Sequence, residues 1–187
     1  MTRHAWILLA LAACSNEVGG DPAPDAAQAA DALPANCTAA ADLGDLGPRT
    51  GTPMASGVAG SRTVSVSMTV AGDAALRDVL FLNLRVGRGA FAGGDPAPGT
   101  YPITGADADF DTCGACLTLI GDLVAGQGPT QFYFATGGTV TLTSTAGHLT
   151  GSAADVTLQE LDINSSQLVK GGCTSRVAAV SFDVALP

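Results

Sequence analysis

The segment from Gln131 to Ile163 is the part of the sequence that most constrains the fold. Between Thr139 and Thr145, threonine or serine alternates with Val140 and Leu142, which is the two-residue period of a half-buried β-strand. Glycines flank this alternating run and supply residues suited to turns. The segment therefore predicts a continuous antiparallel meander.

The register of the first predicted hairpin depends on which aromatic residues face inward. If Phe132 and Phe134 share a face with Val140, the strands are joined by a three-residue loop over 136–138, whose last glycine takes a left-handed conformation. A two-residue turn made by the two glycines alone is the alternative. That turn would bury Tyr133, because register follows the buried face.

The second predicted hairpin has a two-residue loop at Ala146–Gly147. This register sets large residues against small ones: Leu142 opposite Gly151, and Val140 opposite Ala153. Between Ala153 and Val156, the apolar positions then change from odd-numbered to even-numbered residues. A bulge or bend near Ala154–Asp155 is therefore expected.

Other segments with strand-like alternation are separated by glycine-rich turns, and no long helix is indicated. The expected strands are Thr63–Val70, Val79–Val86, Thr100–Ile103, Cys116–Ile120 and Val177–Leu186, with one helical turn over Ala75–Asp78. This pattern predicts an all-β fold, an antiparallel two-sheet β-sandwich. A closed β-barrel is the alternative.

Composition restricts the class of protein further. The 187 residues include 17 acidic and 8 basic side chains, giving a formal net charge of −9. Phosphate binding needs a basic face, and the arginines form no run, so a nucleic-acid partner is disfavoured. The length suits one domain with a tail.

The N-terminus carries the features of a bacterial export signal. A basic residue, Arg3, precedes an apolar run that ends in Leu11-Ala12-Ala13-Cys14. This ending resembles a lipobox, in which Cys14 is lipidated after residues 1–13 are removed, and the run is too short for a permanent membrane span. An ordinary secretory signal is the alternative. Ser15 after the cysteine favours the outer membrane.

Residues 14–36 are predicted to form the lipidated cysteine and a flexible acidic linker, because alanine, proline, aspartate and glycine dominate them. Residues 37–187 form the predicted β-sandwich domain. The partner expected from the sequence is the membrane, through the lipid anchor, and no motif indicates a particular protein or glycan partner.

Four cysteines remain after Cys14, namely Cys37, Cys113, Cys116 and Cys173. An even number in an exported chain predicts disulfides, and we favour Cys113 with Cys116 and Cys37 with Cys173, although the other pairings stay open. A redox CxxC and a four-cysteine zinc site are alternatives. The first needs a helix after Cys113, where a strand is expected, and the second lacks another CxxC pair.

Asp107, Asp109 and Asp111 occupy alternate positions and would share one face of a strand. They are weak candidates for calcium binding or for a carboxylate-based hydrolase, and a solvated acidic loop is the simpler interpretation, since the EF-hand pattern fails. His148 is expected to be a surface residue. Tyr101 and Tyr133 are the only tyrosines, and the only tryptophan, Trp6, lies in the signal, which weakens a sugar-binding interpretation.

The lipobox, the acidic Ala/Pro tether, the segment from Gly99-Thr100-Tyr101 to Cys113-x-x-Cys116 and the segment 131–147 together resemble the uncharacterised β-rich lipoproteins of myxobacterial type. That resemblance implies a cell-envelope location, on the outer membrane facing the periplasm or the surface, and a β-rich fold, but assigns no catalytic residue. The sequence thus predicts a non-enzymatic binding or structural module without a cofactor. An envelope hydrolase or a calcium-assisted binding module is the alternative.

Overall fold

The computed structural model describes residues 36–57, 61–73 and 75–186, which lie in the compact unit Asp31–Pro187. The predicted signal peptide, Cys14 and the linker up to residue 35 lie outside the described residues. Within them the fold is all-β, with two short 3-10 helices, η1 (Gly89–Phe91) and η2 (Gly105–Ala108).

The strands are β1 (Asp45–Arg49), β2 (Thr52–Ser56), β3 (Thr63–Gly72), β4 (Leu76–Arg85), β5 (Gly99–Pro102), β6 (Ala115–Val124), β7 (Gln131–Ser144), β8 (His148–Asp162), β9 (Gln167–Leu168) and β10 (Thr174–Ala185). They form one mixed sheet with the order β1-β10-β8-β7-β6-β4-β3-β2, while β5 pairs with β7 and β9 with β8. The pairing of β1 with β10 is parallel.

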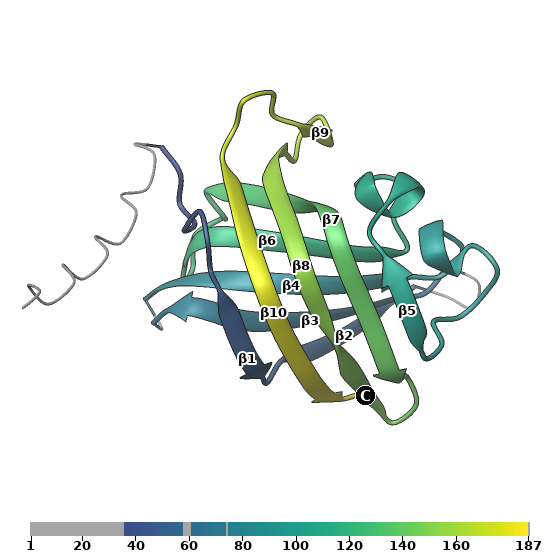
Figure 1. Ribbon diagram of the computed structural model, residues 1–187. Helices are drawn as coiled ribbons and strands as arrows, with labels where there is room; N and C mark the ends of the chain where they lie inside the picture. The colour runs from purple at the N-terminus through teal and green to yellow at the C-terminus, as the bar shows by residue number, and fades with distance from the viewer. Residues whose placement is uncertain (1–35, 58–60, 74, 187) are drawn as a thin grey trace, which may run out of the picture. The chain divides into compact units, whose positions relative to one another are not determined.

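The sheet is strongly curled and forms a half-barrel. Figure 1 shows β10, β8 and β7 crossing the direction of β6, β4 and β3, and the main core lies between these two parts of the sheet. The two-sheet sandwich predicted from the sequence is not confirmed, because one continuous ladder links all the strands. The barrel alternative is partly consistent with this arrangement.

Alternating side chains of β3 and β4 supply much of the core, as predicted. Val64, Val66, Met68 and Val70 are buried on β3, and Leu80, Leu82 and Leu84 are buried on β4. The predicted helical turn over Ala75–Asp78 is wrong. β4 already begins at Leu76 and pairs there with Val124 of β6, so tertiary pairing overrides the weak local preference.

The hairpin predicted at residues 136–138 is absent from the described structure, because β7 runs unbroken through this stretch. The β7–β8 ladder instead shifts register on both sides of Gly137. Gly138 has a φ of 114°, and a Cβ there would lie 2.7 Å from the Cα of Val156. The glycines therefore form a bulge that bends a long strand, rather than a turn.

The bulge also reverses which residues of β7 face the main core. Tyr133 joins Val140 there, as in the alternative register, whereas Phe134 packs in a second cluster on the other face. The predicted large-to-small pairs, Leu142 with Gly151 and Val140 with Ala153, are confirmed. So is the irregularity near Asp155, which has a φ of 51°.

β1 and β2 are the two ends of the strand order, yet only Thr50 and Gly51 separate them in the chain. The chain therefore passes at this corner from a strand beside β10 to a strand beside β3. Neither strand was predicted, because their five-residue segments carry little apolar alternation. The corner positions the arginine that is central to the site described below.

Candidate functional site

The three aspartates singled out in the sequence do not share a strand face. Asp107 lies in η2 and is buried, and its Oδ1 accepts hydrogen bonds from the backbone N–H groups of Gly114 (2.8 Å) and Ala115 (2.9 Å). Asp109 Oδ1 accepts from the N–H groups of Asp111 (3.0 Å) and Thr112 (3.1 Å). The three residues lie in a loop, which was the simpler interpretation, because aspartates readily cap turns; Asp107, however, is buried and not solvated.

Two of the three carboxylates are thus occupied in holding the loop that leads into β6. Asp107 satisfies two buried N–H groups, which would otherwise cost free energy to bury. Among the residues that the structure describes, no three His, Cys, Asp or Glu side chains gather closely enough to hold a metal ion. The geometry gives Asp107 and Asp109 structural roles.

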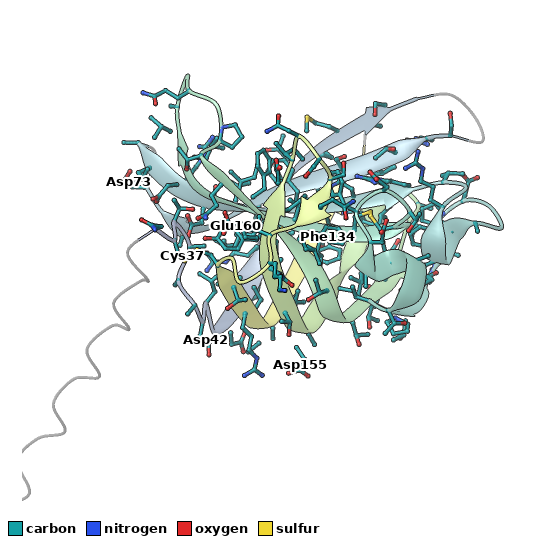
Figure 2. All side chains as sticks on the ribbon, turned by 90° about the horizontal axis from the view of Figure 1, so that it is seen from above. Cys37, Asp42, Asp73, Phe134, Asp155 and Glu160 are labelled. Carbon is teal, nitrogen blue, oxygen red and sulfur yellow. A yellow bond between two sulfur atoms is a disulfide. The ribbon has the colours of Figure 1, made fainter. Side chains whose placement is uncertain are left out.

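The cysteines pair in the way that the sequence analysis favours. Cys37 bonds to Cys173, with a Cα–Cα distance of 5.7 Å, and Cys113 bonds to Cys116 at 5.5 Å. The backbone N–H of Cys173 also donates to Glu160 Oε2 (2.8 Å), and Figure 2 shows Glu160 beside Cys37 at one end of the sheet. The first bridge ties the start of the domain to the beginning of β10.

The second bridge belongs to a small apolar cluster rather than to an exposed redox motif. Cys113 and Cys116 are fully buried with Phe134 and Leu161, and Phe110 packs edge-on against Phe134 at a centroid distance of 5.6 Å. The residues after Cys113 enter strand β6 and not a helix. This placement agrees with a structural bridge, since reactive cysteines sit in partly exposed sites.

His148 and Asp183 form a pair that the sequence analysis missed. His148 Nδ1 lies 2.7 Å from Asp183 Oδ1, with exposed side-chain fractions of 59% and 69%. The two residues are adjacent because β8 pairs with β10, a contact between positions 35 apart in the chain. An exposed pair of this kind contributes at most about 1 kcal/mol, and His148 is a surface residue, as expected.

Both tyrosines make contacts within the domain, Tyr133 in the core and Tyr101 at a partly buried position. Tyr133 is fully buried, and its hydroxyl donates to Gln131 Oε1 (2.7 Å). Tyr101 donates to the carbonyl of Ala97 (2.6 Å) and packs edge-on against Phe91. Their rings are therefore taken up by the fold, which fits the weakness of the sugar-binding interpretation.

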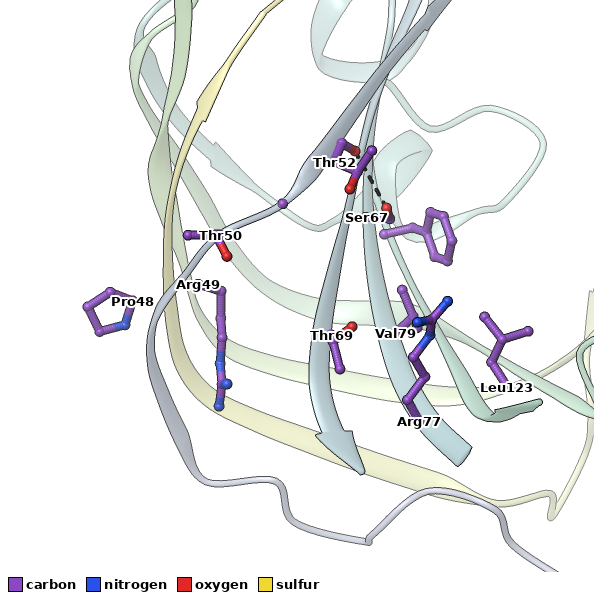
Figure 3. Close-up of a pocket in the computed structure, with 11 residues that line it drawn as sticks. Pro48, Arg49, Thr50, Thr52, Ser67, Thr69, Arg77, Val79 and Leu123 are labelled. Carbon is purple, nitrogen blue, oxygen red and sulfur yellow. Dashed lines mark hydrogen bonds between the residues drawn. The ribbon is translucent and has the colours of Figure 1, made fainter. Parts of the chain in front are cut away.

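A cavity of about 500 Å³ lies where the β1–β2 corner meets β3, β4 and β6. Arg49 lines it from the end of β1, and Arg77 lines it from the start of β4. Figure 3 shows the two arginine side chains on either side of Thr69 of β3. Two segments far apart in the chain thus bring two cations to one cavity.

The electrostatics of this cavity are opposite to those of the whole chain. None of the described residues that line it is acidic, although the protein carries a net charge of −9. Within the described ranges, ion pairs join His148 to Asp183 and Arg176 to Asp155, so neither Arg49 nor Arg77 has a carboxylate partner. Two guanidinium groups without a counter-ion favour an anionic ligand.

The rest of the lining divides into a polar and an apolar part. Thr50, Thr52, Ser67 and Thr69 supply hydroxyl groups, and Val79, Phe81 and Leu123 supply apolar surface. Ser67 donates a long hydrogen bond to the carbonyl of Thr52 (3.5 Å), drawn as a dashed line in Figure 3. No sequence motif indicates this site, because Arg49 and Arg77 are far apart in the chain.

Comparisons with protein-family models, with curated proteins and with solved structures give no significant match. In the part of the chain that the structure describes, no helix is long and apolar enough to cross a bilayer. The site is therefore interpreted from its own chemistry.

Proposed function

We propose that this protein is a lipid-anchored binding module of the bacterial cell envelope. In this proposal Cys14 carries the lipid, residues 15–36 form the tether, and the curled sheet is the binding domain. The lipobox and its resemblance to β-rich lipoproteins support the outer membrane as the site of attachment. The domain acts by holding a ligand rather than by catalysis.

The pair Cys37–Cys173 is the observation that carries the proposal. Disulfides persist in oxidising compartments and are rare in the cytosol of most bacteria. This bridge joins residues 136 positions apart, beginning directly after the predicted tether. The predicted tether ends where the cross-linked domain begins, as expected for an exported, anchored domain.

The arginine-lined cavity supports binding as the activity. Two arginines and four hydroxyl groups line it, and the Ser67 hydroxyl among them donates to the carbonyl of Thr52. Its volume lies in the usual range of small-molecule sites, roughly 300–1,000 Å³. The cavity thus has the size and the donor groups that a binding module requires.

The anchor is tested with Cys14→Ala, expressed in a bacterium that processes lipoproteins. A single cysteine carries the thioether-linked lipid, so the variant is expected to lose incorporation of labelled fatty acid and to move from the detergent phase to the aqueous phase. Ser15→Ala, which keeps the thiol, is the matched control and should still be labelled. Partitioning of the Cys14→Ala protein equal to wild type would contradict the anchor.

A further inference from the structure

The cavity at the β1–β2 corner has a chemistry specific enough to indicate a class of ligand. We propose that it binds a small organic oxyanion, with a carboxylate or phosphate group between Arg49 and Arg77 and an apolar body against Phe81. This assignment deepens the proposed binding function and rests on it.

The charge of the lining favours an anion over a neutral or cationic ligand. Both arginines are half-buried, and the other described lining residues are uncharged. A guanidinium presents several N–H donors in a planar fork that matches the two oxygens of a carboxylate or phosphate. Partial burial strengthens such a contact, because solvent and salt screen it less.

The fold buries part of the Arg49 side chain before any ligand arrives. Its Nε is buried and has no hydrogen-bond partner among the described residues. The side chain therefore packs along the corner instead of extending freely into solvent, and its donors are not used within the described structure. A buried donor without a partner costs free energy, and a ligand that accepts a hydrogen bond from it would offset that cost.

The hydroxyl groups extend the polar side of the cavity. Ser67 and Thr69 alternate along β3 with the buried side chains of the main core, so both project from the outer face of the sheet. The Thr69 hydroxyl can donate to an oxyanion that the arginines hold, and the Ser67 hydroxyl can do so when it leaves its long hydrogen bond to the carbonyl of Thr52. The arrangement supplies both charge-assisted and neutral hydrogen bonds to one ligand group.

The apolar side distinguishes an organic anion from a free inorganic ion. Val79 is buried, while Phe81 and Leu123 line the same cavity on β4 and β6. An inorganic phosphate would leave this apolar surface wet, whereas an organic body would cover it. A ligand with an acidic group and an apolar body fits both sides.

The test uses the full chain, purified in a non-ionic detergent, and nuclear magnetic resonance titration of its backbone amides. The probes are benzoate, phenyl phosphate, inorganic phosphate and the neutral benzyl alcohol. We expect benzoate or phenyl phosphate to shift the amides of Ser67, Thr69 and Val79 in a saturable way, more tightly than inorganic phosphate or benzyl alcohol. Added salt should weaken the binding.

Which probe binds best identifies the acidic group. A preference for benzoate assigns a carboxylate ligand, and a preference for phenyl phosphate assigns a phosphate monoester. Failure of both to bind saturably, or equal binding of benzyl alcohol, would overturn the proposal. These comparisons need only the wild-type protein, so they remain decisive if a variant does not fold.

Variants then assign the charge to particular residues. Arg49→Gln and Arg77→Gln should each weaken binding of the preferred probe by about tenfold or more, the effect of losing one charge-assisted contact. Arg176→Gln removes the same charge from an exposed residue of β10 that pairs with Asp155, and should leave the affinity unchanged. Equal losses in all three variants would mean that net charge, and not this cavity, attracts the anion.

The outcome is separable from that of the anchor experiment. Loss of lipidation in Cys14→Ala together with no probe binding would keep the envelope anchor and reject the ligand class. Probe binding with no lipidation of the wild-type chain would do the reverse. Each proposal can therefore fail alone.

Discussion

Leu142 of β7 lies directly opposite Gly151 of β8, and the glycine leaves no room for a side chain of its own. A Cβ at Gly151 would lie 2.1 Å from the carbonyl oxygen of Thr141 and 2.9 Å from the ring of Phe182. Leu142 is 2% exposed and belongs to the main core. Where β7 and β8 approach closely, the side chain of Leu142 therefore fills the core and the glycine opposite it contributes only backbone.

This packing predicts a large difference between two neighbouring substitutions. Leu142→Ala should lower the free energy of unfolding by about 2–5 kcal/mol, because it leaves a cavity in the core. Thr141→Ala, on the other face of β7, should cost well under half of that. Urea denaturation of both variants measures the contrast, and equal midpoints would show that the two faces of β7 are covered alike.

The role of Asp107 predicts a loss of stability that is unrelated to metal binding. Asp107→Ala would leave the N–H groups of Gly114 and Ala115 without an acceptor, at about 1–3 kcal/mol for each group. Asp111→Ala is the control, since that side chain is exposed, and it should change stability by less than about 0.5 kcal/mol. Thermal denaturation measures both.

The effect of added calcium on the melting temperature distinguishes this structural role from a calcium-binding site. If Asp107 and Asp109 only cap backbone groups, added calcium should leave the melting temperature of the wild-type protein unchanged. A calcium-dependent rise that Asp111→Ala abolishes would restore the calcium hypothesis, because a ligand that binds the native state stabilises it.

The two disulfides should contribute unequally to stability. In the chain-entropy model, closing the loop between Cys37 and Cys173 stabilises by about 5 kcal/mol, and closing the one between Cys113 and Cys116 by about 2 kcal/mol. The reason is the sequence separation, 136 residues against 3. Paired serine variants, compared by chemical denaturation, should therefore differ, with the loss of the long-range bridge costing more.

The oxidation state is checked separately by titrating free thiols in the denatured mature protein. None of the four domain cysteines should react before reduction, and the domain should melt at a lower temperature in reductant. Two reactive thiols or more would contradict the disulfide framework.

Asp78 and Asp162 should make contributions to the free energy of unfolding that change in opposite directions as pH rises. Burial raises the pKa of Asp78 above its ordinary value of 3.8, although the N–H of Asp122 donates to its carboxylate (2.9 Å) and opposes the rise. The N–H of Asn164 and the hydroxyl of Ser165 lower the pKa of exposed Asp162.

A raised folded-state pKa means that the wild type loses stability as pH rises from 3.8 through that folded pKa. Asp78→Asn should therefore gain stability relative to wild type over this window. A lowered folded-state pKa means that stability is present above 3.8 and lost on acidification, so Asp162→Asn should lose relative stability as pH rises. Denaturation midpoints measured across acidic pH test both, and slopes of the same sign would contradict the assignment.

The sequence by itself determined the strands that have one face in the core and one face in contact with solvent. In β3 the buried positions from Val64 to Val70 alternate with serine and threonine, so periodicity alone identified the strand and its inner face. The match of Leu142 to Gly151 was predicted from a two-residue loop at Ala146–Gly147. The pair is present, but three residues separate β7 from β8, and a register shift between Leu142 and Ser144 compensates for the longer loop. Local alternation is sufficient where only one face is buried.

Only the tertiary structure decided the features of β7 and β6 that are buried on both faces. Tyr133 packs in the main core and Phe134 in the second cluster. Both residues are apolar, so no alternation of polar and apolar residues indicates which of them faces the main core. The glycines at 137 and 138 suit a turn and a bulge equally well. Pairing of β7 with β8 on one side, and with β6 and β5 on the other, selects the bulge.

The candidate site was also decided by tertiary structure alone. Arg49 and Arg77 lie in segments with no common motif, and they line one cavity because the chain turns at Thr50 and Gly51 from the β10 side of the sheet to the β3 side. Alternation along a strand reports which face is buried. It carries no information on which distant strand lies alongside, and that is set by the curl of the whole sheet.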